Sequence, residues 1–198
     1  MKEFADEEYT EDKCEKLIDT LTMDYYKSHK DILKNLVIKQ RVKRITVVGE
    51  ERGLLLITRD NTMIYNPISN APLIDHIELP LSSIKGILKM RYMFKYKALE
   101  IFLYNQSNSI YIEFESESVQ KIVFDYLLSH CKNLNPYFAD VEYYCRLWIE
   151  RKISNFDYLL FINRIASRSF NDLSQYPVFP WVLSEYYTNS TFNINVSY

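Results

Sequence analysis

Seven short runs of apolar residues, followed by one amphipathic stretch, constrain the fold of this chain more than any other feature. The runs are rich in β-branched and aromatic residues and span residues 44–48, 53–58, 62–66, 74–79, 84–91, 98–104 and 109–114. In the last run, Ile110, Ile112 and Phe114 alternate with Tyr111 and Glu113, which places the two sets on opposite faces of an extended chain. The pattern therefore predicts seven consecutive β-strands.

An amphipathic helix is predicted directly after the seventh strand. Ser116 or Ser118 is suited to cap its N-terminus. Its apolar residues recur at spacings of three and four and comprise Val119, Ile122, Val123, Tyr126 and Leu127. Seven strands and a closing helix resemble the pleckstrin-homology (PH) barrel, in which the helix plugs one open end. We expect this barrel to fold around Leu55, Ile57, Ile101, Phe102, Ile112, Phe114 and Val123.

An acidic lead is predicted to precede the barrel. Residues 1–17 carry seven acidic residues and three lysines. Residues 11–36 show the periodicity of a helix, with an apolar stripe of Cys14, Leu17, Ile18, Leu21 and Tyr25. We assign residues 1–40 to this lead and residues 41–133 to the barrel. The basic residues between positions 39 and 44 are interpreted as the junction.

Two further helices are predicted beyond a connector at residues 132–139. Asp140 is placed to cap the first helix, and Ser154, with Asp157 three residues later, to cap the second. The second helix carries apolar residues almost all round, so we expect it to be buried on more than one side. Its apolar residues are Phe156, Leu159, Leu160, Phe161, Ile162 and Ile165.

The segment from Trp148 to Trp181 resembles the beginning of a BEACH domain, a module of large membrane-traffic scaffolds. The resemblance rests on the residues 153–156 (ISNF), on 171–173 (NDL) and on 176–181 (YPVFPW). One position departs from the family pattern, because Ser167 stands where glycine is usual. We therefore expect a strained turn at Ser167, since serine tolerates a left-handed backbone less well than glycine does.

The preceding region supports the same family. Residues 53–58, 81–85 and 91–102 resemble the divergent PH-like module that leads BEACH domains. The expected fold class is α+β, with a PH-like seven-stranded β-barrel and its C-terminal helix. An N-terminal helix precedes the barrel, and a truncated, mostly helical BEACH segment, residues 140–198, follows it.

The resemblance also implies a partner-binding groove between the two modules. Its candidate residues in this chain are Asn171, Asp172, Tyr176, Trp181, Arg91 and Tyr92. A purely structural role stays open for each of them, because Asn and Asp side chains commonly satisfy irregular backbone and aromatic residues pack in cores.

A basic stretch offers an alternative function, which is phosphoinositide binding by a membrane-targeting PH domain. No acidic residue interrupts it, and it comprises Lys85, Lys89, Arg91, Lys95 and Lys97. Against this alternative, residues 49–52 are interpreted as the turn between the first two strands, where Glu50 and Glu51 would repel a phosphate. We therefore expect weak or absent phosphoinositide binding, and stronger binding to anionic liposomes when both acids are reversed to lysine.

Several functional classes are disfavoured by composition and motifs. The net charge of −2 argues against a nucleic-acid partner. Three glycines exclude a glycine-rich phosphate loop, and the three cysteines and three histidines form no metal-ligand or catalytic spacing. We therefore expect no enzyme activity, no metal and no cofactor. No stretch approaches 18 apolar residues, and the free cysteines suit a reducing compartment, so the expected location is cytoplasmic. The resemblance further implies a location peripheral to membranes.

The function that the resemblance implies is non-catalytic. It is that of a scaffold or adaptor in vesicle, lysosome-related or autophagic membrane traffic, which acts through protein partners and through packing of the PH-like module on the BEACH segment. Because the apolar residues of the BEACH segment lack the rest of that domain, we expect the truncated form to self-associate or to need a partner. A chain that ends near Asn135 is predicted to be a better-behaved monomer.

Overall fold

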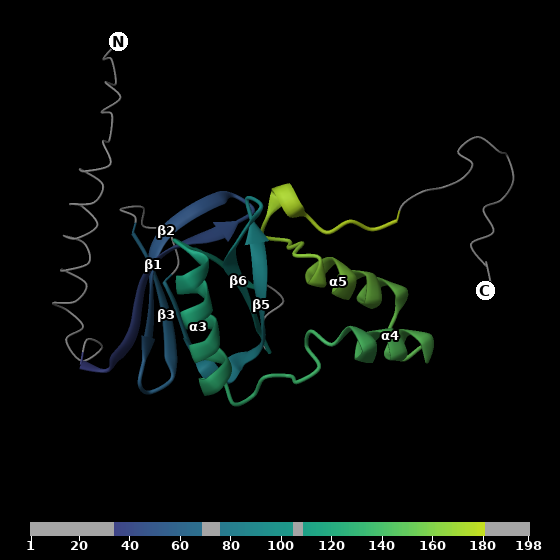
Figure 1. The fold of residues 1–198 in the computed structure, drawn as a ribbon, viewed down its shortest axis with the longest axis horizontal. Coiled ribbons are helices and arrows are strands. Elements are labelled where there is room, and N and C mark those ends of the chain that lie inside the picture. The colour runs from purple at the N-terminus through teal and green to yellow at the C-terminus, as the bar shows by residue number, and fades with distance from the viewer. Residues whose placement is uncertain (1–33, 69–75, 105–108, 181–198) are drawn as a thin grey trace, which may run out of the picture.

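A curled antiparallel sheet of seven strands forms the first half of the molecule. The computed structural model describes residues 34–68, 76–104 and 109–180. The strands follow the order β4-β3-β2-β1-β7-β6-β5 across the sheet. They are β1 (Leu36–Thr46), β2 (Gly49–Thr58), β3 (Thr62–Pro67), β4 (Ile77–Pro80), β5 (Ile84–Tyr92), β6 (Lys95–Leu103) and β7 (Ile110–Phe114). This sheet and the helix α3 (Glu117–His130) confirm the predicted PH-like arrangement, in which the sheet curls around the helix (Figure 1).

The first two strands are longer than predicted. β1 begins at Leu36 rather than Arg44, and β2 begins at Gly49 rather than Gly53. Charged residues concealed the alternation in β1, where buried Ile38 and Val42 are separated by outward-facing basic residues. Residues 39–44 are therefore part of a strand and not a junction. The predicted helix at 11–36 lies almost wholly outside the described residues, and its last residue is the first residue of β1.

The core of the barrel contains six of the seven residues predicted for it. Leu55, Ile57, Ile101, Ile112, Phe114 and Val123 are all fully or almost fully buried in one cluster. Phe102 is the exception, because side chains alternate along β6 and Phe102 lies on the opposite face from Ile101. On that face its ring packs at 5.0 Å, centroid to centroid, from the ring of Phe138.

The outer face of β5, β6 and β7 is also buried, and the connector after α3 covers part of it. Met90, Tyr92 and Tyr111 form a second cluster there with Phe138. The Phe138 ring lies directly on Gly86, where an added Cβ atom would come within 2.3 Å of the ring. A chain that ends near Asn135 would lose this cover, and the prediction that such a chain is a better-behaved monomer stays a prediction.

Two short helices follow the connector and pack against each other. Asp140 caps α4 (Val141–Ile149), and Ser154 and Asp157 form the predicted capping box of α5 (Asn155–Ile165). The rings of Tyr144 and Phe161 stack between the helices at 4.0 Å, centroid to centroid. Among the apolar residues of α5, only Phe161 is buried, so the described part of the chain covers this helix on one side only.

The left-handed turn predicted at Ser167 is confirmed, because this residue has a φ of 60°. It ends α5 in a Schellman motif, in which the Ser167 N–H donates to the Arg164 carbonyl and the Arg168 N–H donates to the Asn163 carbonyl. The backbone hydrogen bonds hold the conformation that the side chain disfavours.

We expect Ser167→Gly to raise the free energy of unfolding by about 1 kcal/mol, because glycine adopts this φ without the clash of a Cβ atom. Urea denaturation measures the change. Ser129→Gly, within α3, is the matched control and should be destabilising, since its position has no left-handed backbone. Equal effects of the two substitutions would contradict the strain at Ser167.

Candidate functional site

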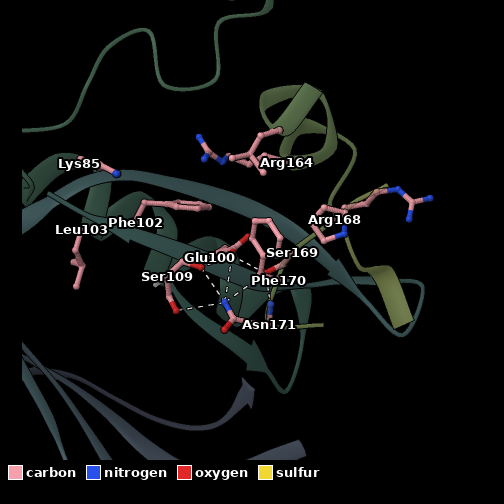
Figure 2. A pocket seen from close by; sticks show the side chains of 12 residues that line it. Lys85, Glu100, Phe102, Leu103, Ser109, Arg164, Arg168, Ser169, Phe170 and Asn171 are labelled. Carbon is pink, nitrogen blue, oxygen red and sulfur yellow. Dashed lines mark hydrogen bonds between the residues drawn. The ribbon is translucent and has the colours of Figure 1, made fainter. Parts of the chain in front are cut away.

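A cavity of about 170 Å³ lies where the outer face of the sheet meets the C-terminal segment. β5 and β6 form one wall, and α5 and the residues after it form the other (Figure 2). Its polar lining comes from both halves of the molecule and comprises Lys85, Glu100, Ser109, Arg164, Arg168, Ser169 and Asn171. The site is therefore built from the junction of the two modules.

Glu100 is the centre of the contact between the two halves. It faces outward from β6, yet only 2% of its surface is exposed. Its Oε1 atom accepts hydrogen bonds from the hydroxyls of Ser109 and Ser169, the latter at 2.6 Å. Asn171 joins the network, because its Nδ2 donates to Ser109 Oγ at 2.9 Å and its backbone N–H donates to Ser169 Oγ at 3.1 Å. A strand residue thus anchors a segment about 70 positions further along the chain.

The carboxyl group of Glu100 is held in an unfavourable setting for its charge. Its Oε2 atom is buried without a hydrogen-bond partner among the described residues. Burial raises the pKa of Glu100, although the two serine hydroxyls and the nearby Arg164 act in the opposite direction. The folded protein therefore binds a proton at Glu100 more tightly than the unfolded chain does.

This shift predicts that acid strengthens the contact. Because the folded-state pKa of Glu100 lies above its unfolded value, stability is lost as the pH rises through the folded-state pKa and regained as the pH falls toward the unfolded value. Thermal melts of the parent and of Glu100→Gln over this range provide the measurement. The parent should gain stability relative to the variant on acidification, and a difference that does not change with pH would contradict the assignment.

Three cations line the cavity, and burial affects two of them, Arg164 and Lys85. The Arg164 guanidinium lies 4.6 Å from the ring centroid of Phe102 and 5.0 Å from that of Phe138, so the two rings hold it by cation–π contact. Burial lowers the pKa of Arg164. Burial, and then the charge of Arg164, lower the pKa of Lys85. The cavity therefore gathers positive charge that an acidic group could neutralise.

The groove residues predicted from the resemblance do not all meet at this cavity. Asn171 lines it, and the adjacent Asp172 is buried beside it, where its Oδ1 accepts from the backbone N–H and the hydroxyl of Ser174 at the start of η2 (Leu173–Gln175). Tyr92 is buried beneath the interface and donates from its hydroxyl to Glu50 Oε1 at 2.7 Å. Tyr92 thus has a packing role.

The remaining predicted groove residues lie elsewhere. Tyr176 is exposed, and its ring contacts that of Phe170 edge-on. Arg91 lies 6.0 Å from the ring centroid of Tyr96, close to the turn between β5 and β6. Trp181 lies outside the described residues. Sequence reasoning missed Glu100, Ser109, Arg164 and Ser169, and the one signal for them was an acidic residue inside the apolar run at 98–104.

The basic residues of the alternative lipid site do not converge. Lys85 lines the cavity, and Lys89 lies 4.6 Å from the ring centroid of Phe124 on α3. Lys97 forms an ion pair of 2.6 Å with the buried carboxylate of Glu113. Arg91 and Lys95 lie at the other end of the same hairpin. No common headgroup pocket brings these five residues together.

The prediction that residues 49–52 form an acidic turn, which was the argument against lipid binding, was wrong. Glu50 and Glu51 are paired strand residues of β2, and Val47 and Val48 form the turn instead. Glu50 forms an ion pair of 2.8 Å with Lys43, and Glu51 lies 3.4 Å from Arg44. Reversal of both acids would therefore break these pairs as well as add charge, so the expected rise in liposome binding no longer rests on a free acidic loop.

Comparison with known families identifies the two halves. The model of the PH domain associated with Beige/BEACH matches residues 69–128, and that of the Beige/BEACH domain matches residues 146–197. The chain belongs to the BEACH-domain family. The cavity therefore lies between the PH-like module and the start of the BEACH domain.

Curated relatives of this BEACH protein are much longer than the chain. A neurobeachin homolog from Caenorhabditis elegans is 38% identical over 137 residues, which are 62% of this chain and 5% of the relative. The BEACH domain-containing protein lvsE from Dictyostelium discoideum is 38% identical over 108 residues, 50% of this chain and 5% of the relative. The chain thus spans about one twentieth of the relatives that it matches.

Solved structures show weaker likeness. The Slm1 PH domain in complex with inositol 4-phosphate is 11% identical, with a TM-score of 0.40, and the match covers 50% of this chain and 99% of that one. A C-terminal domain of an unknown protein from Leishmania infantum is 18% identical, with a TM-score of 0.42, over 56% of this chain and 96% of that one. The fold assignment therefore rests on the strand order and the family match.

The surface of the BEACH segment exposes apolar side chains. Ile149 of α4 and Phe156 and Ile162 of α5 are among them. The expected self-association stays a prediction. Within the described ranges, no helix is long and apolar enough to cross a membrane.

Proposed function

We propose that this BEACH-family module is a non-catalytic scaffold or adaptor in vesicle, lysosome-related or autophagic membrane traffic. It acts through protein contacts at the cavity between the PH-like module and the BEACH segment, on the cytoplasmic side of membranes. The observation that carries the proposal is the Glu100 network, because it fixes the two modules in one arrangement and leaves a cavity that both line. A preorganised surface of this kind suits partner recognition.

The chemistry of the cavity favours an acidic partner group. Lys85, Arg164 and Arg168 lie around it, and the hydroxyl of Ser109 can serve as a hydrogen-bond donor or acceptor. An Asp or Glu side chain of a partner protein would neutralise the two cations whose pKa values are lowered. This pattern favours protein recognition over phosphoinositide recognition, because the remaining basic residues point to other parts of the barrel.

Proximity labelling in cells tests the proposal, with the reversals Lys85→Glu and Arg168→Glu combined in one variant. The parent should label proteins of vesicle traffic, and the double variant should lose them, because it presents negative charge to an acidic group. Lys121→Glu, on the exposed side of α3, is the control and should retain them. An identical set of labelled proteins from parent and double variant would contradict the proposal.

Calorimetry with soluble inositol phosphates tests the alternative separately. We expect no measurable binding by the unmodified chain. Binding that Lys89→Ala and Lys97→Ala abolish would favour the phosphoinositide alternative, because these residues belong to that candidate set and lie outside the cavity.

A further inference from the structure

The hairpin between β5 and β6 ends in a turn of unusual composition. Met93 and Phe94 are its two central residues, between the paired Tyr92 and Lys95. Both have positive φ, 47° and 63°, which defines a type I′ turn. Asn and Gly are preferred there, because bulky side chains are strained in this conformation. Both side chains are nevertheless exposed, Phe94 by 80%. The turn therefore holds two large apolar groups in solvent at a conformational cost.

A second apolar turn lies beside the first. Val47 and Val48 connect β1 to β2, and Val48 is 94% exposed. The hydrogen bond from the Tyr92 hydroxyl to Glu50 joins the ends of the two hairpins at 2.7 Å. In Figure 1 both hairpins end at the same upper edge of the barrel. Val47, Val48, Met93 and Phe94 together are called the hairpin tip below.

Positive charge surrounds the hairpin tip. Residues 43–52 and 91–97 carry six basic residues and two acidic ones, and Glu113 pairs with Lys43 and Lys97. Six basic and three acidic residues leave a formal charge of +3 around the tip, although the whole chain has a net charge of −2. The six are Lys43, Arg44, Arg52, Arg91, Lys95 and Lys97. Tyr96, which is also exposed, adds an amphipathic ring next to Lys95. An apolar end with a basic collar matches the interface of an anionic bilayer, where acyl chains lie beneath negative headgroups.

We propose that the hairpin tip is a shallow insertion surface for anionic lipid bilayers. Phe94, Met93 and the two valines enter the boundary between headgroups and acyl chains, and the basic collar stays at the level of the headgroups. The contact is non-stereospecific, because it needs a charged surface and not one bound headgroup. This membrane contact is separate from protein binding at the cavity, since the tip lies outside that cavity. It would give the scaffold a defined orientation on a membrane.

The test replaces the turn Met93-Phe94 by Asn-Gly in the 198-residue chain. These residues favour the type I′ turn, so the melting temperature should rise by several degrees while binding to phosphatidylserine-containing vesicles falls about tenfold. Because stability should rise while binding falls, a loss of binding cannot be explained by unfolding of the variant. Co-sedimentation with phosphatidylcholine vesicles, with and without phosphatidylserine, measures binding. Ile149→Ser, on α4, removes another exposed apolar group and should leave binding unchanged.

Two further experiments distinguish attraction to a charged membrane surface from binding of a single headgroup. Lys95→Ala should weaken binding about fivefold, as expected for one basic residue near an anionic surface, and added salt should weaken it further. Excess soluble inositol phosphate should not compete. The proposal would be overturned if soluble inositol phosphate competed completely or if the Asn-Gly variant bound as well as the parent. It would also be overturned if the parent did not bind anionic vesicles. In the last case the tip would be a surface for a protein partner.

Discussion

Ile101→Asp is expected to lower the free energy of unfolding by about 5 kcal/mol. Ile101 is almost fully buried in the core of the barrel, between β5 and β7 in the sheet. The substitution leaves a cavity and places a carboxylate where the surrounding residues are apolar. No ion pair is available to it in the first cluster, which consists of hydrophobic residues.

Circular dichroism at increasing temperature gives the measurement. Because a domain of this size loses several degrees of melting temperature per kcal/mol, the variant should be largely unfolded at physiological temperature. Ile122→Asp, at an exposed position of α3, is the control and should change stability little. Melting of Ile101→Asp at the parental temperature would mean that the barrel is assigned wrongly.

Glu100→Lys is the second substitution with a large expected effect. It adds a cation to the three that already line the cavity and removes the acceptor of the Ser109 and Ser169 hydroxyls. A buried charge without an opposite partner costs about 3–5 kcal/mol. Since Glu100 points away from the barrel core, the loss should fall on the contact between the modules.

Limited proteolysis separates the two modules. The variant should be cut rapidly between residues 132 and 180, while residues 36–130 persist as a resistant fragment. Glu115→Lys makes the same charge change at an exposed position and should be cut no faster than the parent. Equal resistance of Glu100→Lys and Glu115→Lys would show that the Glu100 network does not hold the BEACH segment.

The sequence predicted most of the fold because its strands and helices carry local signals. The alternation in β7 and the capping box at Ser154 each identify a structure through neighbouring residues alone. The turn at Ser167 was instead predicted from the family pattern, which has glycine at this position. The signal failed in β1, where basic residues face outward on both sides of Val42 and lower the apparent apolar character of a strand.

The candidate site was harder to predict, because its residues are distant in sequence. A glutamate in a strand such as β6 normally indicates a solvent-facing side, and nothing near Glu100 shows that Ser169 will bury it. Phe102 was placed in the wrong cluster for the same reason, since the segment that covers it comes after α3. By contrast, Asn171 was identified because the family resemblance marked its motif.

The central claim is that the chain after α3 packs on the outer face of the PH-like sheet in a fixed arrangement, beginning with the connector that leads into the BEACH segment. Nuclear Overhauser effects between the Gly86 α-protons and the Phe138 ring protons test it most directly, because the ring lies against this glycine. We predict strong cross-peaks and an upfield ring-current shift of the Gly86 α-protons. Gly86 resonances at ordinary strand positions, without any cross-peak to Phe138, would contradict it.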